Sequence, residues 1–361
     1  MSDVRRPISE AEMPESRLLE AVRWSPDQRA VRIIDQRRLP NDFVERDLTT
    51  LDEVREAIHT LAVRGAPAIG ICGAMGLAMS AAPHAHEPRD AFLARTRELA
   101  RDIAATRPTA VNLPWAVARV LSRAERTAGT GDAIVEAMRE EATAILEEDR
   151  AMCLRIGEAG AELLPEKARV LTHCNAGALA TGGLGTALAP LYVAASRGRS
   201  VSVLATETRP LLQGSRLTAW ELSRAGIPVT VITDSAAASR MRGGDVDLCI
   251  VGADRVVANG DVANKVGTYS LAVLAKHHGI PFYVAMPTST IDPSLESGEQ
   301  IVIEERDPAE VSTLGDRRVT AQGATVGNAA FDITPSALVT AFITDRGVLH
   351  PPYDFHRKHS A

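Results

Sequence analysis

The chain has 361 residues, of which 45% are hydrophobic and 24% are charged; this is typical of a folded globular protein rather than a disordered or fibrous one. Its 40 Lys and Arg residues against 46 Asp and Glu residues give a formal charge of −6. That charge argues against a dedicated nucleic-acid binder, which usually presents a basic face. The length is enough for about two domains.

No targeting or membrane-spanning segment is expected. Residues 1–17 mix both signs of charge and contain no apolar core, so they do not form a signal peptide. Two uncharged stretches, 66–83 and 175–196, approach the length of a membrane span but consist mainly of Ala and Gly, and are predicted as buried helices. The four cysteines show no CxxC spacing. We therefore expect a cytoplasmic protein with no metal site and with neither a membrane nor a nucleic-acid partner.

The first third of the chain predicts a mainly helical domain with a small sheet, residues 1–130. A strand over Val31–Asp35 is followed by a turn and a second short extended segment over 43–46. Helical periodicity then begins near Leu51, with Thr50 or Asp52 as the possible cap. Residues 131–164 form one long periodic run, predicted as a connecting helix.

From residue 165 to the end, β-branched runs alternate with Gly-rich turns and helical segments. Strands are predicted at Val170–Thr172, Val201–Ala205, Val229–Ile232, Leu248–Val251 and Phe282–Ala285. Strands that alternate with helices indicate βαβ units and a parallel sheet covered on both faces. The fold class is therefore α/β, with a Rossmann-like parallel-sheet domain over 165–361.

Polar residues follow four of these strands. They are His173–Asn175, Thr206–Arg209, Asp254 with Arg255, and Met286–Thr288. In an open parallel sheet, ligands bind beyond the carboxyl ends of the strands. One polar strand end is ordinary turn sequence, but four on one rim favour a binding or catalytic site.

Cys174 is the cysteine with functional neighbours, since Cys72, Cys153 and Cys249 lie in apolar patterns typical of core residues. We expect Cys174 at the N-terminus of a helix, where a thiol can be activated as acid, base or nucleophile. The adjacent His173 should point to the opposite face of the strand and is interpreted as structural.

Asp254 ends the apolar run Leu248–Ala253. Its carboxylate should lie in a partly dry crevice, where desolvation raises a carboxyl pKa into the range of a proton donor. The alternatives are a helix cap or an ion pair with Arg255. Residues 256–260 look like a β-turn segment rather than a helix, which disfavours the cap.

Arg64 and Gly65 stand directly before Ala-rich helical sequence, with Pro67 suited to the first helical turn. Exposed backbone N–H groups and a guanidinium in this arrangement predict a phosphate cradle. Polar groups also precede helical segments at three other places, each of which is equally explained as a surface loop: Arg107 to Asn112, Gln213 to Arg216, and Asn264 to Gly267.

A dinucleotide site was the competing interpretation, because Gly183 and Gly185 follow a strand and Glu207 lies about 20 residues further on. The glycines begin too far beyond the strand for the tight turn that a pyrophosphate needs. Close packing of an Ala/Gly helix on the sheet explains them better.

Six motifs, taken together and in order, resemble those of the methylthioribose-1-phosphate isomerase family of methionine salvage, over roughly Ser25 to Asp354. They are Arg64–Gly70, Arg107–Leu113, His173–Gly177, Glu207–Gly214, Gly252–Arg255 and Asn264–Gly267. The wider superfamily contains ribose-1,5-bisphosphate isomerases and the non-catalytic regulatory subunits of a guanine-nucleotide exchange factor of translation initiation.

The resemblance implies conversion of 5-methylthioribose 1-phosphate, an aldose, to 5-methylthioribulose 1-phosphate, a ketose, by a homodimer without metal or redox cofactor. It implies Asp254 as proton donor and Cys174 as base or transition-state stabiliser. The implied substrate contacts are Arg64, Gly65, Ala66, Arg107, Gln213, Asn264 and Lys265, and every one of these positions matches the family pattern.

Two alternatives stay open from sequence. The first is the same chemistry on another phosphorylated pentose, such as 5-deoxyribose 1-phosphate or ribose 1,5-bisphosphate. The second is a non-catalytic regulatory subunit that senses a sugar phosphate or a nucleotide in the same crevice. Loss of Cys174 or Asp254 would have favoured that second alternative, and both residues are present.

Overall fold

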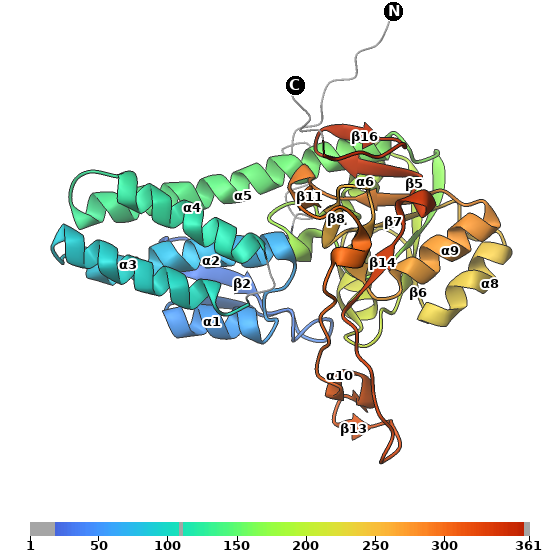
Figure 1. Cartoon of the computed structure of the whole chain (residues 1–361), viewed down its shortest axis with the longest axis horizontal. Helices are drawn as coiled ribbons and strands as arrows, with labels where there is room; N and C mark the ends of the chain where they lie inside the picture. The colour runs from blue at the N-terminus through green and yellow to red at the C-terminus, as the bar shows by residue number, and fades with distance from the viewer. Residues whose placement is uncertain (1–18, 108–110, 357–361) are drawn as a thin grey trace, which may run out of the picture.

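The computed structural model describes residues 19–107 and 111–356. Figure 1 shows a helical half and a sheet-containing half joined by the long helix α5 (Gly131–Ala161), with an arm that projects from the second half. The apolar side chains of α5 divide between two cores. Ile134 and Leu146 pack in the first core, whereas Cys153 and Ile156 pack in the second.

The helical half begins with a three-stranded antiparallel sheet in the order β1-β2-β3, over which the helices pack. Its elements are β1 (Val22–Trp24), β2 (Val31–Ile34), β3 (Glu45–Leu48), α1 (Leu51–His59), α2 (Ala66–Ala81), α3 (Arg89–Ala104) and α4 (Asn112–Arg126). Of the two predicted caps for α1, the structure uses Thr50, which forms a capping box with Glu53.

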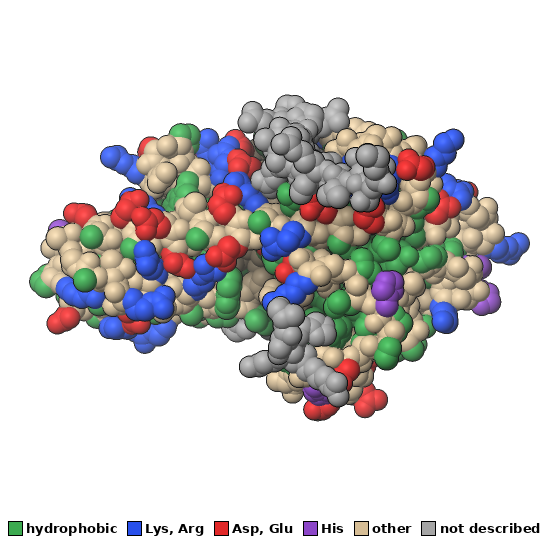
Figure 2. Space-filling model, turned by 90° about the horizontal axis from the view of Figure 1, so that it is seen from above, with side chains coloured by type: hydrophobic (Ala, Val, Ile, Leu, Met, Phe, Trp, Pro, Cys, Tyr) green, Lys and Arg blue, Asp and Glu red, His purple; other side chains and the backbone are tan. Residues whose placement is uncertain are grey.

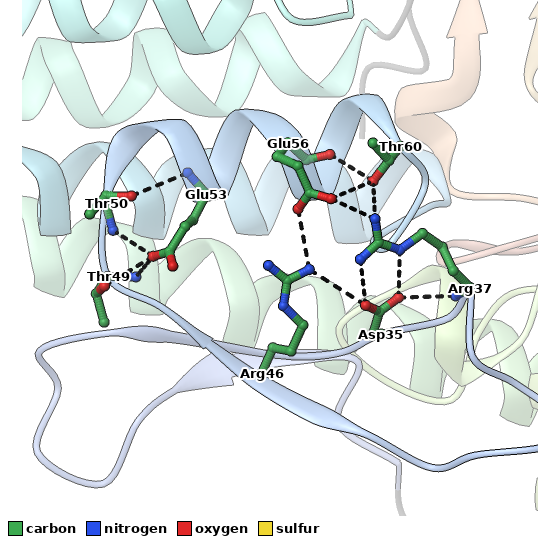
Figure 3. A network of polar contacts seen from close by, with 8 residues as sticks. All are labelled: Asp35, Arg37, Arg46, Thr49, Thr50, Glu53, Glu56 and Thr60. Atoms are coloured by element: carbon green, nitrogen blue, oxygen red, sulfur yellow. Dashed lines mark hydrogen bonds and ion pairs between the residues drawn. The ribbon is translucent and has the colours of Figure 1, made fainter.

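A charged network fixes the segment that leaves β2. Asp35 is almost fully buried and accepts hydrogen bonds from Arg37 at 2.6 and 2.9 Å, while Arg37 and Arg46 both reach Glu56 on α1 (Figure 3). The guanidinium of Arg37 holds the pKa of Asp35 below its usual range. Buried carboxylates need such partners. The network therefore places Gln36, the next residue, against the second half of the molecule.

Helix α2 runs through the centre of the first core. Together with the residues that follow it, Ala66–His84, it is long and apolar enough to cross a membrane by length and composition, and 72% of its most apolar window is buried inside the protein. A core helix passes the same test, because a helix that is apolar all round is buried in whatever surrounds it. Here α3, α4 and α5 surround it.

The second half is built on a seven-stranded sheet in the order β6-β5-β4-β7-β10-β15-β16, in which only β16 runs antiparallel to its neighbour. The strands are β4 (Lys167–Thr172), β5 (Ser200–Thr206), β6 (Val229–Ile232), β7 (Leu248–Val251), β10 (Phe282–Ala285), β15 (Ala341–Thr344) and β16 (Gly347–Leu349). All five predicted strands are present, and the α/β fold class is confirmed.

Helices cover both faces of this sheet. Alternate strand residues enter different cores: Ile250 packs with α5 and α6 (Ala189–Ser196), whereas Cys249 packs with α8 (Ala237–Arg242) and α9 (Thr268–His278). The chain winds outward from β4 to β5 and β6, then crosses back to β7 on the other side of β4. The strand order therefore reverses between β4 and β7, the place where open α/β sheets bind ligands.

A second, four-stranded sheet lies in the order β11-β8-β9-β14. Its strands are β11 (Ile291–Asp292), β8 (Arg255–Val257), β9 (Val262–Lys265) and β14 (Phe331–Thr334). Between β11 and β14 the chain forms the arm, residues 301–330, which carries α10 (Ala309–Ser312) and the hairpin β12–β13 (Thr313–Leu314 and Arg317–Arg318) away from the body (Figure 1).

The prediction of a long buried helix over 175–196 is wrong. Only α6 and one 3-10 turn, Ala178–Ala180, are helical there. Gly183 and Gly185 lie in the intervening loop, where a Cβ on Gly183 would stand 3.0 Å from the Cα of Arg150 on α5. Gly183 allows a loop, rather than a helix, to approach α5 closely, and Gly185 allows the same loop to approach the backbone at 176–177.

Candidate active site

Cys174 lies in the loop that follows β4, and three side chains from beyond β5 hold it. Its N–H donates to the Thr208 hydroxyl at 2.9 Å and its carbonyl accepts from the Thr218 hydroxyl at 2.6 Å. The amide of Gln213 donates to its sulfur at 3.2 Å. The expected helix N-terminus at Cys174 is wrong, because the next α-helix begins only at Ala189. A side-chain donor, rather than a helix dipole, faces the thiol.

The backbone around this thiol is strained. Cys174, Thr208 and Leu212 have φ values of 64°, 63° and 59°, in the left-handed region that side chains other than Gly seldom adopt. The Asp234 carboxylate fixes part of this segment by accepting from the N–H groups of Thr208 and Arg209 at 2.8 Å each. Strain of this kind persists where the surroundings impose it and clusters at functional sites.

His173 directly follows β4, and its contacts agree with the interpretation that it is structural. One ring nitrogen contacts the Thr206 hydroxyl at 2.6 Å and the other contacts the Val266 carbonyl at 2.8 Å. Burial lowers its pKa, so the ring stays neutral. A neutral imidazole with both nitrogens engaged does not pair with Cys174 as a catalytic base.

Arg64 and Gly65 stand at the start of α2. The Arg64 guanidinium donates to the Asn175 side-chain oxygen at 2.6 Å and to the Asn175 carbonyl at 2.9 Å, so it lies beside the Cys174 loop. Gly65 has φ 91°, and a Cβ there would stand 2.3 Å from the Ala180 carbonyl oxygen. Among the residues that the structure describes, no side chain caps α2. Its first N–H groups, including that of Ala66, therefore remain available to an anion.

Asp254 follows β7, the strand hydrogen-bonded to β4. Its N–H donates to the Ala263 carbonyl at 2.9 Å, and the chain continues into β8 instead of a helix. Arg255 pairs with Asp292 at 3.4 Å. Asp254 is therefore neither a helix cap nor the ion-pair partner of Arg255.

The environment of Asp254 suits a proton donor. Its side chain is exposed to solvent, and desolvation by the protein around the carboxyl raises the pKa in the direction that the sequence predicts. The positive charges of Lys265, Arg64 and Arg107 lower the pKa and limit the rise. A carboxyl that stays protonated to a higher pH than usual is able to act as a general acid.

Lys265 ends β9 and links several of the predicted residues. Its ammonium donates to the Ala330 carbonyl at 2.6 Å and lies over the Phe331 ring. Burial lowers its pKa, while the charges of Cys174 and Asp254 raise it. Lys265 is thus the cation that acts on both of the groups implied in the chemistry.

The start of α9, which the sequence left open between a polar binding segment and a surface loop, is already occupied by a carboxylate. Asp332 on β14 accepts the N–H groups of Gly267 and Tyr269 at 2.7 and 3.1 Å, so a carboxylate already occupies this helix N-terminus. Asn264 lies opposite Asp332 in the β9–β14 pairing and donates to Thr268 at 3.0 Å. The local sequence could not show a cap that comes from 65 residues away.

Arg107 joins the same group of charges from the helical half. Its pKa is lowered by burial, by Arg306 and by Arg64, and raised by Glu304 and Asp254. The loop that follows it, 108–110, lies outside the described residues. The structure therefore brings together the predicted Arg64, Arg107, Cys174, Gln213, Asp254 and Lys265 within electrostatic or hydrogen-bonding reach of one another.

Sequence reasoning missed the contribution of the arm. Arg306 is held by Glu310 at 2.6 Å and by Glu304 at 3.4 Å, and its charge acts on Arg107 and Lys265. The arm residues are joined to the site through Ala330, whose N–H donates to the Glu304 carbonyl at 2.9 Å. Neither periodicity nor turn sequence signals that a distant loop returns to the site.

Among the described residues, no group of three or more His, Cys, Asp or Glu side chains is placed to hold a metal ion. On the face seen in Figure 2, cationic and anionic side chains are interspersed over the helical half, in line with ion pairs such as Arg119 with Glu141 at 2.6 Å. The absence of a metal or cofactor stays a prediction.

Comparison with known proteins places this geometry in context. Residues 62–351 match the model of the initiation factor 2 subunit family. A methylthioribose-1-phosphate isomerase from Gemmatimonas aurantiaca is 55% identical over 333 residues, which cover 92% of this chain and 94% of the relative. A 5-deoxyribose 1-phosphate isomerase from Moorella thermoacetica is 54% identical over 334 residues, 92% of this chain and 94% of the relative.

Two solved structures share the fold over almost their whole length. The 5-methylthioribose 1-phosphate isomerase of Pyrococcus horikoshii superposes with a TM-score of 0.90 at 45% identity, covering 98% of this chain and 97% of that one. A structure described as translation initiation factor eIF-2B, subunit delta, from A. fulgidus gives 0.87 at 44% identity, covering 93% and 97%.

Proposed function

The chain belongs to the initiation factor 2 subunit family, and on that premise we propose that it is the aldose–ketose isomerase that converts 5-methylthioribose 1-phosphate to 5-methylthioribulose 1-phosphate in methionine salvage. One observation carries the proposal. Cys174 and Asp254 follow β4 and β7, the two neighbouring strands between which the strand order reverses. Relatives at 55% identity carry the same activity in their names.

The substrate's phosphate binds at the start of α2, where free N–H groups and the Arg64 guanidinium offer hydrogen bonds to an anion. Arg107 and Lys265 add positive charge around the same space. Because the phosphate ester sits on C1, the sugar cannot open spontaneously to a free aldehyde. The protein must hold this ester intact while the ring opens.

Asp254 opens the ring as general acid. Its proton goes to the ring oxygen as the bond from C1 to that oxygen breaks. Hydrogen then moves from C2 to C1, C2 becomes the ketone, and the phosphate stays on C1. C1 is reduced as C2 is oxidised, so the reaction balances without an external oxidant.

Cys174 serves the hydrogen transfer in either of two balanced routes. In the proton route its thiolate takes the C2 proton and returns it to C1, while the C2 hydroxyl proton passes to the Asp254 carboxylate. In the hydride route the C2 hydrogen moves to C1 with its electron pair, and Cys174 takes the hydroxyl proton. Substrate deuterated at C2 separates them, because only the hydride route retains all the label at C1.

5-Deoxyribose 1-phosphate is a second candidate substrate, because a relative with that activity in its name is 54% identical to this chain. It differs from the first only in lacking the methylthio group at C5. The reacting carbons and the phosphate are the same, so both fit the mechanism above. Ribose 1,5-bisphosphate would need additional cationic groups at the C5 end.

The regulatory-subunit alternative is supported by the name of one structural neighbour at 44% identity. Against it stand an acid with a raised pKa and a thiol held by Gln213, neither of which a binding module requires.

We also propose that the protein is cytoplasmic and forms a homodimer. The free state of all four cysteines supports the first part of this proposal, and the family resemblance supports the second. Light scattering of the purified protein measures its mass.

Phosphorus and carbon NMR of the protein with each of the three phosphorylated pentoses tests the proposal. A new ketone carbon with the phosphate still esterified is expected for 5-methylthioribose 1-phosphate, and at comparable or lower rate for 5-deoxyribose 1-phosphate. If folded protein leaves all three unchanged, the isomerase proposal fails and the regulatory subunit takes its place.

A further inference from the structure

Glu221 is a buried acid that the mechanism above does not use. It lies on α7 (Ala219–Arg224) with 1% of its surface exposed. One carboxyl oxygen, Oε2, accepts the N–H of Leu179 at 3.1 Å. The other, Oε1, has no hydrogen-bond partner among the described residues. An unpartnered oxygen on a buried carboxyl is costly, and native proteins seldom keep one without a functional reason.

The surroundings are shaped to receive this carboxyl. A Cβ added to Gly177 would stand 1.5 Å from Oε1, so only glycine leaves room for it. Leu179 is held on both sides, since its carbonyl accepts from the Gln36 amide at 2.7 Å while its N–H donates to Glu221. The Glu221 carboxyl therefore packs against the loop that carries Cys174 and is hydrogen-bonded to it.

Glu221 acts beside Thr218, one helical turn earlier. The Thr218 hydroxyl donates to the Cys174 carbonyl and accepts from the Asn175 amide, and Asn175 in turn binds Arg64. Residues three apart on a helix lie on one face. One face of α7 and the turn before it thus supports both the thiol and the guanidinium that we assign to the phosphate.

The ionisable groups around Glu221 show which charge affects its ionisation. Burial raises its pKa to about 7, while the Leu179 N–H, the charge of Arg64, and the nearby Tyr192 hydroxyl and Asn175 amide lower it; neither of these last two groups forms a hydrogen bond with Oε1. Burial and the nearby Glu221 raise the pKa of Tyr192, so Tyr192 stays neutral. Arg64 is therefore the one cation among these groups that acts on Glu221.

We propose that Glu221 is a positioning residue of the phosphate site, which holds the 174–179 loop and whose negative charge competes with the substrate's phosphate for Arg64. This inference rests on the proposed function only in assigning the phosphate to Arg64. A dianion bound at Arg64 offsets the charge that favours ionised Glu221, so binding promotes proton uptake by Glu221. Affinity for the anion then falls as Glu221 ionises.

Glu221→Gln tests this, because the amide keeps an acceptor for Leu179 and removes the charge. At pH 6 the wild type is largely neutral at Glu221 and resembles the variant, so the two KM values should agree. At pH 8 the wild-type KM should exceed that of the variant by 3-fold or more, with kcat within 2-fold. A KM ratio that is the same at both pH values would overturn the proposal.

Asp149→Asn is the matched control. Asp149 is also a buried acid that accepts a loop N–H, from Gly182 at 2.6 Å, and burial raises its pKa to about 6. Arg64 is not among the groups that act on it. The KM ratio of this variant should not change between pH 6 and pH 8. An equal pH dependence in both variants would show a general effect of buried acids and contradict the proposal.

Calorimetry with sulfate keeps the test independent of turnover. Sulfate mimics a phosphate dianion and does not titrate between pH 6 and 8. Titration in two buffers of different ionisation heat should show proton uptake by the wild type at pH 7, and less uptake by Glu221→Gln. Equal uptake refutes the role of Glu221 even if the protein proves not to be an isomerase.

If Glu221→Gln does not fold, Tyr192→Phe replaces it in the calorimetric test. Because the Tyr192 hydroxyl lowers the pKa of Glu221, proton uptake by this variant should persist to higher pH than in the wild type. An unchanged pH range contradicts the proposal.

Discussion

The two ends of the candidate site are constructed differently. At the start of α2, the helix N-terminus is left uncapped and Arg64 stands beside it. At the start of α9, Asp332 fills the helix N-terminus, while the proposed acid Asp254 precedes β8 and the cation Lys265 ends β9, the strand paired with β14. The N-terminus of α2 is therefore open to an anion, whereas the N-terminus of α9 is already bound to a carboxylate of β14.

This difference separates binding from chemistry. The α2 end belongs to the helical half and offers backbone N–H groups and the Arg64 guanidinium. The β4 and β7 ends offer a thiol and an acid. Substitutions at the first end should therefore change KM, and those at the second should change kcat.

The largest effect is expected at Asp254. Asp254→Asn cannot donate the proton that opens the ring, so kcat should fall by about 10²–10⁴-fold, the usual contribution of a general acid. In the wild type, kcat/KM should decline as pH rises through the pKa of Asp254, which desolvation by the surrounding protein raises above that of an ordinary carboxyl. Steady-state rates from pH 5 to 9 measure both. A variant with wild-type kcat would remove Asp254 from the mechanism.

Cys174→Ser should follow, with a loss of about 10²–10³-fold in kcat because a hydroxyl is a poor substitute for a thiolate base. Cys72→Ala is the control, since Cys72 is fully buried in the first core and should keep its rate. Iodoacetamide gives a second readout. The other three cysteines are inaccessible, so peptide mapping should find Cys174 alkylated first, and protection by substrate is expected.

Arg64→Ala should act mainly on KM. Charge-assisted hydrogen bonds contribute about 1.5–3 kcal/mol each, so the KM should rise by about 10–100-fold while kcat changes less. Arg38→Ala removes an exposed arginine of the same half and should leave both constants unchanged. A loss confined to kcat in Arg64→Ala would erase the distinction between the two ends.

Asp332→Asn should have the smallest kinetic effect. Loss of the charge at the α9 N-terminus should cost about 1 kcal/mol of folding stability, measured by urea unfolding. The KM should change by less than a factor of about 3, since this end does not hold the phosphate. A marked fall in KM would mean that α9, once uncapped, binds the anion as the sequence pattern suggests.

The parallel sheet was predictable because its central strands are continuous apolar runs, such as Leu248–Val251, separated by helical sequence. Thr50 likewise carries a cap signature that is local. In contrast, β9 and β14 are short strands that pair across more than 60 residues, and no local pattern encodes such pairing. The glycines at 183 and 185 signalled close packing, but not that a loop would provide it.

In the site, the positions of Cys174 and Asp254 directly after predicted parallel strands were enough to predict that they lie close together, because parallel strands place their carboxyl ends at one rim of the sheet. It was insufficient where a contact depends on tertiary structure. The Gln213 donor at the thiol, the Asp332 cap and the buried Glu221 each act on a residue at least 39 positions away. Only the folded chain shows which polar groups are already occupied.

Calorimetric titration of 5-methylthioribose 1-phosphate into Asp254→Asn, alone and combined with Arg64→Ala, tests the separation of the two ends most directly. The single variant should bind the sugar phosphate with an affinity close to the wild-type KM and leave it unconverted, and the double variant should lose most of that binding. Equal binding by the two variants, or none by the first, would contradict an account in which α2 holds the phosphate and the β4–β7 rim performs the chemistry.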